Sequence, residues 1–212
     1  DVAVVGATGA VGEEMLKTLF HRRFPYGKVY AVASSRSAGE FVDFGDTELE
    51  VQDLATFDFA KVKIGLFSPG AEVSKVYAPK AAAAGCIVID NTSQFRQDKD
   101  IPLVVPEDNP QAIAQYKNRG IIANPNCSTI QMVVALNAIQ EAATIKRVVV
   151  STYQSTSGAG KEGMDELFNQ TRNVFTNGSL DHKKFTKQIA FNVIPHIDVF
   201  MDDGYTKEEC KM

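Results

Sequence analysis

The stretch DVAVVGATGAVGEEMLKTLFHRR, residues 1–23, decides the fold class. A short apolar run leads into glycines 6, 9 and 12, and a helical pattern follows, with Val11, Met15, Leu19 and Phe20 predicted on its apolar face. A strand, a glycine turn and a helix in this order typically open a nucleotide-binding parallel sheet. The spacing is G-x-x-G-x-x-G, with Thr8 where a second glycine of G-x-G-x-x-G would stand. A turn that is tight only for packing is the alternative.

Residues 24–126 continue the alternation of apolar runs and helical patterns. Further strands are predicted at 28–34, 63–68, 86–91, 100–109 and 120–126, and helices at 70–85 and around 110–116. The chain between the strands at 28–34 and 63–68 is polar and irregular. Six candidate strands predict an α/β fold with a Rossmann-type doubly wound sheet.

The pattern changes after residue 127. A long apolar helix is predicted at 128–143, a β-branched strand at 146–157 and a helix that follows the glycines at 158–171. Residues 173–204 are irregular. We therefore predict a domain boundary near residues 124–127, with a nucleotide-binding domain at 1–126 and the N-terminal part of a second domain at 127–212.

Composition narrows the functional class. Apolar residues make up 44% of the 212 residues, charged residues 23%, and the net charge is -4. This balance gives no basic surface for nucleic acid and no polybasic membrane patch, and no apolar run is long enough to span a bilayer. Three widely spaced cysteines predict neither a disulfide framework nor a metal site, and fit a reducing cytoplasm.

The loop after the second strand indicates the nucleotide. An NAD site carries an acidic residue there, whereas an NADP site carries positive or neutral donors. The run ASSRSAG places Ser34, Ser35, Arg36 and Ser37 there, with no carboxylate before Glu40. A guanidinium flanked by hydroxyls suits a 2′-phosphate, so we predict NADP. A solvated polar loop is the alternative.

Cys127, in ANPNCSTIQMVV (residues 123–134), is the candidate nucleophile. A polar turn of Asn124, Pro125 and Asn126 precedes it and a predicted helix follows. Helix N-termini favour thiolates, and their free N–H groups can stabilise an oxyanion. Cysteine is also a common buried apolar residue, so local sequence leaves both readings open. Cys86, before an apolar strand, is read as structural.

Seven segments together carry a family resemblance: GATGAVG, ASSRSAG, LFSPG, IDNTSQFR, VVPEDN, NPNCST and STYQSTSGAG. In this order they resemble bacterial-type aspartate-semialdehyde dehydrogenase over essentially the whole chain. The resemblance implies NADPH-dependent reductive dephosphorylation of 4-aspartyl phosphate to L-aspartate 4-semialdehyde, on the route to lysine, threonine and methionine. It also implies a second domain of the glyceraldehyde-3-phosphate dehydrogenase type and a homodimer or homotetramer.

Carried over residue by residue, the resemblance makes Cys127 the nucleophile that forms the acyl-enzyme, with Asn126 in the same turn and Gln154 orienting the intermediate. Arg96 would contact phosphate, and Glu208 with Lys211 would bind substrate. The implied cofactor residues are Gly6, Thr8, Gly9, Ala10, Val11, Ser34, Ser35, Arg36, Ser37, Ser68, Pro69, Gly70, Ser157, Gly158 and, in the same turn, Gly160.

Each of these roles has a simpler alternative. Arg96 could form a surface ion pair with Asp98 or Asp100. Gln154 could be a polar strand residue facing water. The side chains of Glu208 and Lys211 could be an i,i+3 pair on a solvated helix face.

The family's general acid/base histidine and its carboxylate-binding arginine follow the substrate-binding segment, and we expect both beyond Met212. His182 and His196 come too early and are predicted to be structural or surface residues, and His21 to lie at a helix C-terminus. We therefore expect residues 1–212 alone to show little turnover. A related acyl-phosphate reductase, such as N-acetylglutamyl-phosphate reductase, and a non-catalytic NADP-binding module are the alternative functions.

Overall fold

The computed structural model describes residues 1–212, and these divide into two compact units, residues 1–146 and residues 147–212. Each unit is described by itself. The predicted boundary near residues 124–127 would separate helix α3 (Cys127–Ala142) from the sheet, whereas contacts group this helix with the first unit.

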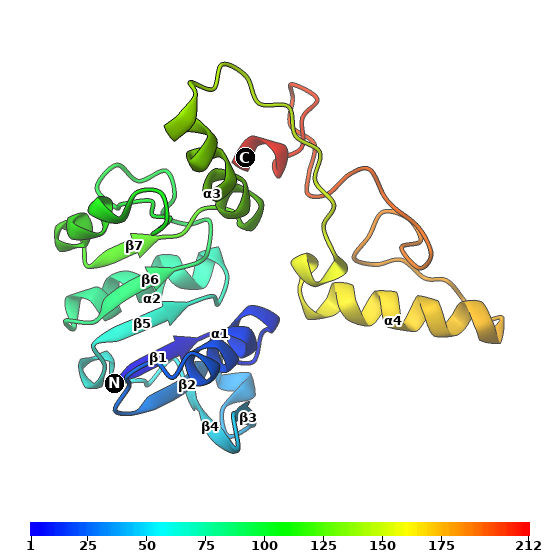
Figure 1. Cartoon of the computed structure of the whole chain (residues 1–212). Coiled ribbons are helices and arrows are strands. Elements are labelled where there is room, and N and C mark those ends of the chain that lie inside the picture. The colour runs from blue at the N-terminus through cyan, green and yellow to red at the C-terminus, as the bar shows by residue number, and fades with distance from the viewer. The chain divides into compact units, whose positions relative to one another are not determined.

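The first unit is built on a seven-stranded sheet of order β3-β4-β2-β1-β5-β6-β7 (Figure 1). Five strands are parallel to their neighbours: β1 (Val2–Val5), β2 (Val29–Ala33), β5 (Ile64–Phe67), β6 (Ile87–Asp90) and β7 (Ile121–Ala123). β4 (Thr47–Asp53) is parallel to β2, and β3 (Phe41–Phe44) pairs antiparallel with β4 at the edge. The predicted doubly wound sheet is confirmed.

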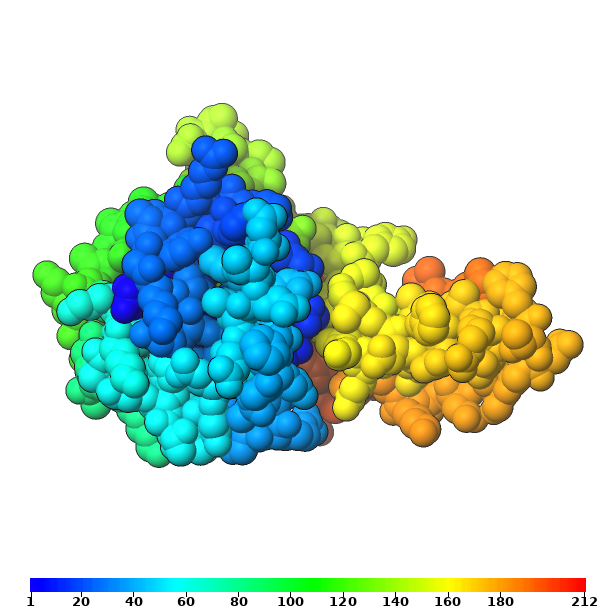
Figure 2. All heavy atoms as spheres, turned by 90° about the horizontal axis from the view of Figure 1, so that it is seen from below, coloured from blue at the N-terminus to red at the C-terminus, as the bar shows by residue number.

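Helices cover both faces of this sheet. Helix α1 (Ala10–His21) buries Leu16 and Leu19 in the apolar cluster that contains Val4, whereas helix α2 (Ala71–Ala83) buries Ala78 and Ala81 in the cluster that contains Val5. Because successive strand residues point to opposite faces, the two helices lie on opposite sides of β1. All four residues of β1 are buried, as expected for a central parallel strand. The space-filling view shows one face of the first unit, in blue to green (Figure 2).

Three predictions about the first unit were wrong in detail. The segment read as polar and irregular contains the β3–β4 hairpin, because an edge strand exposed on one face carries only a weak apolar pattern. Residues 100–109 form no strand: the segment makes one bridge, Leu103 to Ala123, since prolines at 102 and 106 lack the N–H that a ladder needs. On α1, Leu16 is buried and Val11 is 44% exposed.

Short 3-10 helices complete the first unit: η1 (Ser35–Ser37), η2 (Phe59–Lys61) and η3 (Pro110–Asn118). The last of these occupies the predicted helix around 110–116.

The second unit contains η4 (Thr156–Ala159), the amphipathic helix α4 (Lys161–Thr176) and η5 (Glu209–Lys211). The strand predicted at 146–157 is absent. No other strand pairs with this segment, and an unpaired β-strand is not stable. Its valines are therefore exposed, with Val149 at 81%. None of the helices in either unit has the length and apolar character that crossing a bilayer requires.

Candidate active site

The glycine turn between β1 and α1 lies at the carboxyl end of β1, and the backbone packs closely against it. Gly6 has φ +88°, and a Cβ there would lie 2.7 Å from the Ser68 carbonyl oxygen. A Cβ on Gly12 would lie 2.1 Å from the Gly6 carbonyl oxygen. Both positions therefore require glycine. Gly9 caps α1 without a side-chain hydrogen bond, so the N–H groups of the first turn, which includes Ala10 and Val11, point to any anion bound there. Thr8 lies in the same turn.

A second helix begins beside the first. The turn of Ser68, Pro69 and Gly70 joins β5 to α2, and Gly70 caps α2 with φ +94° and no side-chain hydrogen bond. Strands β1 and β5 are paired, with Val5 opposite Phe67, so the two helix N-termini lie at neighbouring positions of one edge. Strand order reverses between β1 and β5, where doubly wound sheets bind their ligand. Two uncapped helix N-termini at this point fit the diphosphate of a dinucleotide.

The loop predicted to read the 2′-position is the helix η1, which follows β2. Ser34 caps η1, Arg36 is exposed and Ser37 is half-buried. The hydroxyl of Ser35 donates a 2.9 Å hydrogen bond to Oδ1 of Asp53, at the end of β4. Asp53 was not predicted from the sequence, because no carboxylate lies near this loop along the chain and strand β4 was not predicted. The run of alternating residues at 47–53 was the signal that could have revealed it.

Cys127 is the first residue of α3 and is exposed. Asn126 is the N-cap: its side chain accepts a 2.8 Å hydrogen bond from the Ser128 N–H, and the residue is only 7% exposed. The turn is tied to the sheet by the Asn124 N–H, which donates to the Asp90 carbonyl at 2.9 Å. The structure therefore presents the sulfur at a rigid helix N-terminus, four residues after β7 and at the same edge as the glycine turn.

Arg96 braces the same turn. Its Nε donates to the Asn124 carbonyl at 2.8 Å and its Nη2 to the Asn91 carbonyl at 2.9 Å. Asp98, one alternative ion-pair partner, contacts Arg119 at 3.6 Å. The guanidinium is thus held at the carboxyl edge of the sheet. Its partner Asn124 lies two residues before Asn126, the N-cap of α3.

Asp90 is a buried carboxyl group beneath this turn. Burial raises its pKa, although its Oδ1 accepts a 2.6 Å hydrogen bond from the Thr92 N–H and the nearby Ser74 hydroxyl and Arg96 partly oppose the shift. Asp90 Oδ2 and Ser74 Oγ are buried without a hydrogen-bond partner. Ionising Asp90 therefore destabilises the fold at the strand ends next to this turn.

The second unit brings three other predicted residues together. Nε2 of Gln154 donates to Glu208 Oε1 at 3.3 Å, and the Lys211 ammonium donates to Glu208 Oε2 at 2.9 Å and to Asp198 Oδ2 at 2.8 Å. The i,i+3 pair exists, but Glu208 is only 12% exposed, so it is no solvated helix face. A Cβ on Gly158 would lie 3.4 Å from the Gln154 amide oxygen.

The charges of this cluster shift one another's titration. Burial alone would lower the pKa of Lys211, but the hydrogen bonds and charges of Asp198 and Glu208 raise it above its usual range. The hydrogen bond from Lys211 in turn lowers the pKa of Asp198. Asp198 was not predicted, because its irregular segment offered no pattern. Ser157 lies next to this cluster in sequence, and its hydroxyl is 2.5 Å from that of Ser155; Gly160 follows with φ +79°.

The histidines have the structural or surface positions that the sequence predicted. His182 is exposed, and His21 is exposed in the last turn of α1. The ring of His196 stacks on Phe200, 4.6 Å between centroids, and its Nε2 is 2.7 Å from the Asp198 carbonyl.

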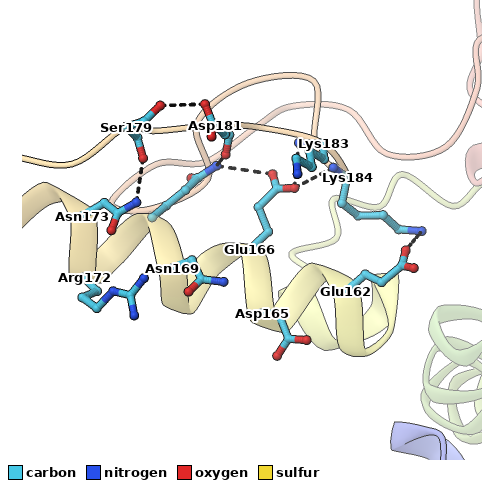
Figure 3. A pocket seen from close by; sticks show the side chains of 11 residues that line it. Glu162, Asp165, Glu166, Asn169, Arg172, Asn173, Ser179, Asp181, Lys183 and Lys184 are labelled. Atoms are coloured by element: carbon cyan, nitrogen blue, oxygen red, sulfur yellow. Dashed lines mark hydrogen bonds and ion pairs between the residues drawn. The ribbon is translucent and has the colours of Figure 1, made fainter.

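A hollow of about 570 Å³ beside α4 contains none of the predicted site residues (Figure 3). The Glu166 carboxylate in its wall accepts backbone N–H groups of Lys183 at 2.8 Å, Lys184 at 2.6 Å and Phe185 at 3.3 Å. Burial alone would raise the pKa of Glu166, but these hydrogen bonds lower it. The hollow is thus the underside of a loop fastened to α4, and we assign it no catalytic part.

Comparison with known proteins identifies the family. The family model "Semialdehyde dehydrogenase, NAD binding domain" matches residues 1–116, more than half of the chain, and "Semialdehyde dehydrogenase, dimerisation domain" matches residues 136–212. The chain belongs to the semialdehyde dehydrogenase family. The predicted boundary near residues 124–127 lies between these two matches and remains a prediction.

Two individual semialdehyde dehydrogenases match the whole chain, and a third matches part of it. Aspartate-semialdehyde dehydrogenase of Shewanella violacea is 55% identical over 212 residues, 100% of this chain and 63% of that protein. Aspartate semialdehyde dehydrogenase II of Vibrio cholerae, solved in complex with ASA, matches with a TM-score of 0.96 at 56% identity, over 100% of this chain and 63% of that one. The Candida albicans enzyme, solved with NADP, has a TM-score of 0.54 at 28% identity, over 68% and 47% of the two chains. The chain thus spans about 63% of the length of the Shewanella relative.

Proposed function

We propose that this chain carries the cofactor site and the nucleophile of an aspartate-semialdehyde dehydrogenase. The reaction is the NADPH-dependent reductive dephosphorylation of 4-aspartyl phosphate to L-aspartate 4-semialdehyde. The observation that carries the proposal is the exposed Cys127 at the capped N-terminus of α3, at the sheet edge that bears the glycine turn. A family member needs both features at one edge.

The chain's residues divide the chemistry. The Cys127 thiolate attacks the acyl-phosphate carbonyl, and the carbon–oxygen bond to phosphate breaks. Inorganic phosphate departs, and the acyl group remains bound to the sulfur as a thioester. Arg96, held by two carbonyl groups, binds the departing phosphate, and the N–H groups of α3 stabilise the oxyanion. Gln154 orients the acyl group, and Glu208 and Lys211 bind substrate. The bound nicotinamide supplies the hydride that, with a proton, releases aldehyde and free thiol.

The cofactor is NADPH in this proposal. Arg36 supplies the positive charge, and Ser34 and Ser37 on either side supply hydroxyl groups that a 2′-phosphate needs; a family relative has been solved with NADP. Removing the Arg36 guanidinium by Arg36→Ala should weaken NADPH binding at least tenfold and NADH binding less than twofold. Arg22→Ala, at the opposite end of α1, is the matched control. Equal losses for both cofactors at position 36 would contradict the assignment.

The activity itself is tested on the protein with acyl phosphates. In a protein that extends beyond residue 212, we expect NADPH oxidation with 4-aspartyl phosphate, none after Cys127→Ser, and at least a hundredfold lower rate with N-acetylglutamyl phosphate. Preference for the second substrate would make the protein a related acyl-phosphate reductase. Cofactor binding without turnover of either, in a protein that extends beyond residue 212, would make it a non-catalytic module.

The functional protein is proposed to be a homodimer or homotetramer in the cytoplasm. The dimerisation-domain match supports self-association. The free cysteines fit a reducing compartment. Light scattering of the purified protein should give a mass of two or four chains, and a monomer would refute this proposal.

A further inference from the structure

Asp53 lies where a cofactor site of this fold discriminates between nucleotides. It is the last residue of β4, and parallel pairing places it opposite Ala33, the last residue of β2. The Leu54 N–H donates to the Ala33 carbonyl at 2.8 Å, which keeps the two strand ends together. A carboxylate distant in sequence therefore reaches the edge from which η1 begins.

This position carries a definite chemical preference. NAD sites place a carboxylate at the end of the second strand, where it accepts a hydrogen bond from the ribose 2′-hydroxyl. The same carboxylate repels a 2′-phosphate. Here the carboxylate is that of Asp53, which belongs to the neighbouring strand β4. The residues directly after β2 contain no carboxylate, but Asp53 lies beside them in the fold.

Asp53 also fixes the hydrogen-bonding role of Ser35. The Ser35 hydroxyl donates its proton to Asp53 Oδ1 at 2.9 Å, and the Ala55 N–H donates to the same oxygen at 2.9 Å. A hydroxyl has one proton. Ser35 therefore presents lone pairs toward a ligand, which suits the proton of a 2′-hydroxyl and not the oxygens of a phosphate dianion.

We propose that Asp53 is a specificity-determining residue that opposes Arg36 at the adenosine ribose, weakening NADPH and retaining NADH as a cofactor. The inference rests on the proposed function, because it concerns the same cofactor site. Arg36 attracts the 2′-phosphate, whereas Asp53 repels it and withholds the Ser35 proton. The balance of these two side chains sets the preference, and Arg36 does not set it alone.

The test is fluorescence titration of the purified protein with NADPH and with NADH, without turnover. Asp53→Asn keeps an oxygen that can accept from both Ser35 and Ala55, so it removes the charge while preserving the loop. A carboxylate within about 5 Å of the phosphate predicts a threefold to tenfold gain in NADPH affinity at low salt. The gain should shrink at 0.5 M salt, because exposed charges are screened. NADH affinity should be unchanged or up to threefold weaker.

Asp46→Asn is the matched control, since it makes the same change at the hairpin turn before β4, about 23 Å from Asp53 along the strand. It should leave the ratio of the two affinities within twofold of the original. A lower NADPH affinity in Asp53→Asn, or equal changes for both cofactors, would overturn the inference. If Arg36→Ala still discriminates in that case, the proposed function stands. If the unmodified protein binds neither cofactor, the proposed function fails first.

Discussion

Asn126→Ala tests whether the capped helix end makes Cys127 a nucleophile. The substitution removes the side-chain oxygen that accepts from the Ser128 N–H at 2.8 Å. Losing an N-cap costs about 1 kcal/mol of unfolding free energy, which corresponds to a shift of about 0.5 M in a urea midpoint. The first turn of α3 then frays, and the helix end stabilises negative charge on the sulfur less well, by about 0.5–1 kcal/mol. We expect the alkylation rate of Cys127 to fall about twofold to fivefold.

The assay is mass spectrometry of peptides after timed exposure to iodoacetamide near neutral pH. Cys210, exposed, and Cys86, buried, serve as internal references within the same sample. Asn126→Ser retains a capping oxygen and is the matched control, with a rate within about twofold of the original. Two results would refute the reasoning: Cys127 reacting no faster than Cys210 in the original protein, or an unchanged Cys127 rate after Asn126→Ala despite a lower urea midpoint.

Three further predictions concern buried or fastened groups. Burial raises the pKa of Cys86 from 9.0 to about 11, so its thiolate is about a hundredfold rarer, and alkylation at pH 8 should reach it only after unfolding in urea. The raised pKa of Asp90 means that the folded state holds this proton more tightly than the unfolded state. Wild-type stability should therefore fall relative to Asp90→Asn as pH rises above about 4, and urea midpoints that keep a constant gap from pH 4 to 8 would contradict this. The lowered pKa of Glu166 contributes stability above about pH 4.3, and this stability is lost as pH falls through the folded pKa. Glu166→Gln should speed hydrogen exchange at the Lys183 and Lys184 amides at neutral pH, because both amides donate to the Glu166 carboxylate. Unchanged exchange would argue against these hydrogen bonds holding the loop to α4.

The parallel sheet and the Cys127 turn were predictable because their signals are local. Glycine at position 12 is demanded by the approach of the Gly6 carbonyl within the same turn, whereas glycine at position 6 is demanded by the Ser68 carbonyl of the turn after β5. Asn126 and Cys127 adjoin one another at a helix start. Runs of apolar residues identified the central strands, since both faces are buried. Apart from the approach of Ser68 to Gly6, these features need no knowledge of distant contacts.

The rest depends on which segments meet. Asp53 meets Ser35 only through the pairing of β4 with β2, and no sequence pattern connects these two residues, which are 18 positions apart. Asp198 joins Lys211 across an irregular segment in the same way. The strand predicted at 146–157 failed for the opposite reason, because its side-chain pattern was right and no partner strand is present to pair with it.

The allocation of residues to the two units also bears on how such enzymes diversify. The glycine turn, Arg96 and Cys127 all belong to residues 1–146, whereas Gln154, Glu208 and Lys211 belong to residues 147–212. On the roles proposed for these residues, a change in the second unit would alter which acyl group is accepted, while the thiol and the dinucleotide site of the first unit would be inherited intact. For protein engineering, the same proposal marks residues 147–212 as the part to exchange in chimeras designed for new aldehydes.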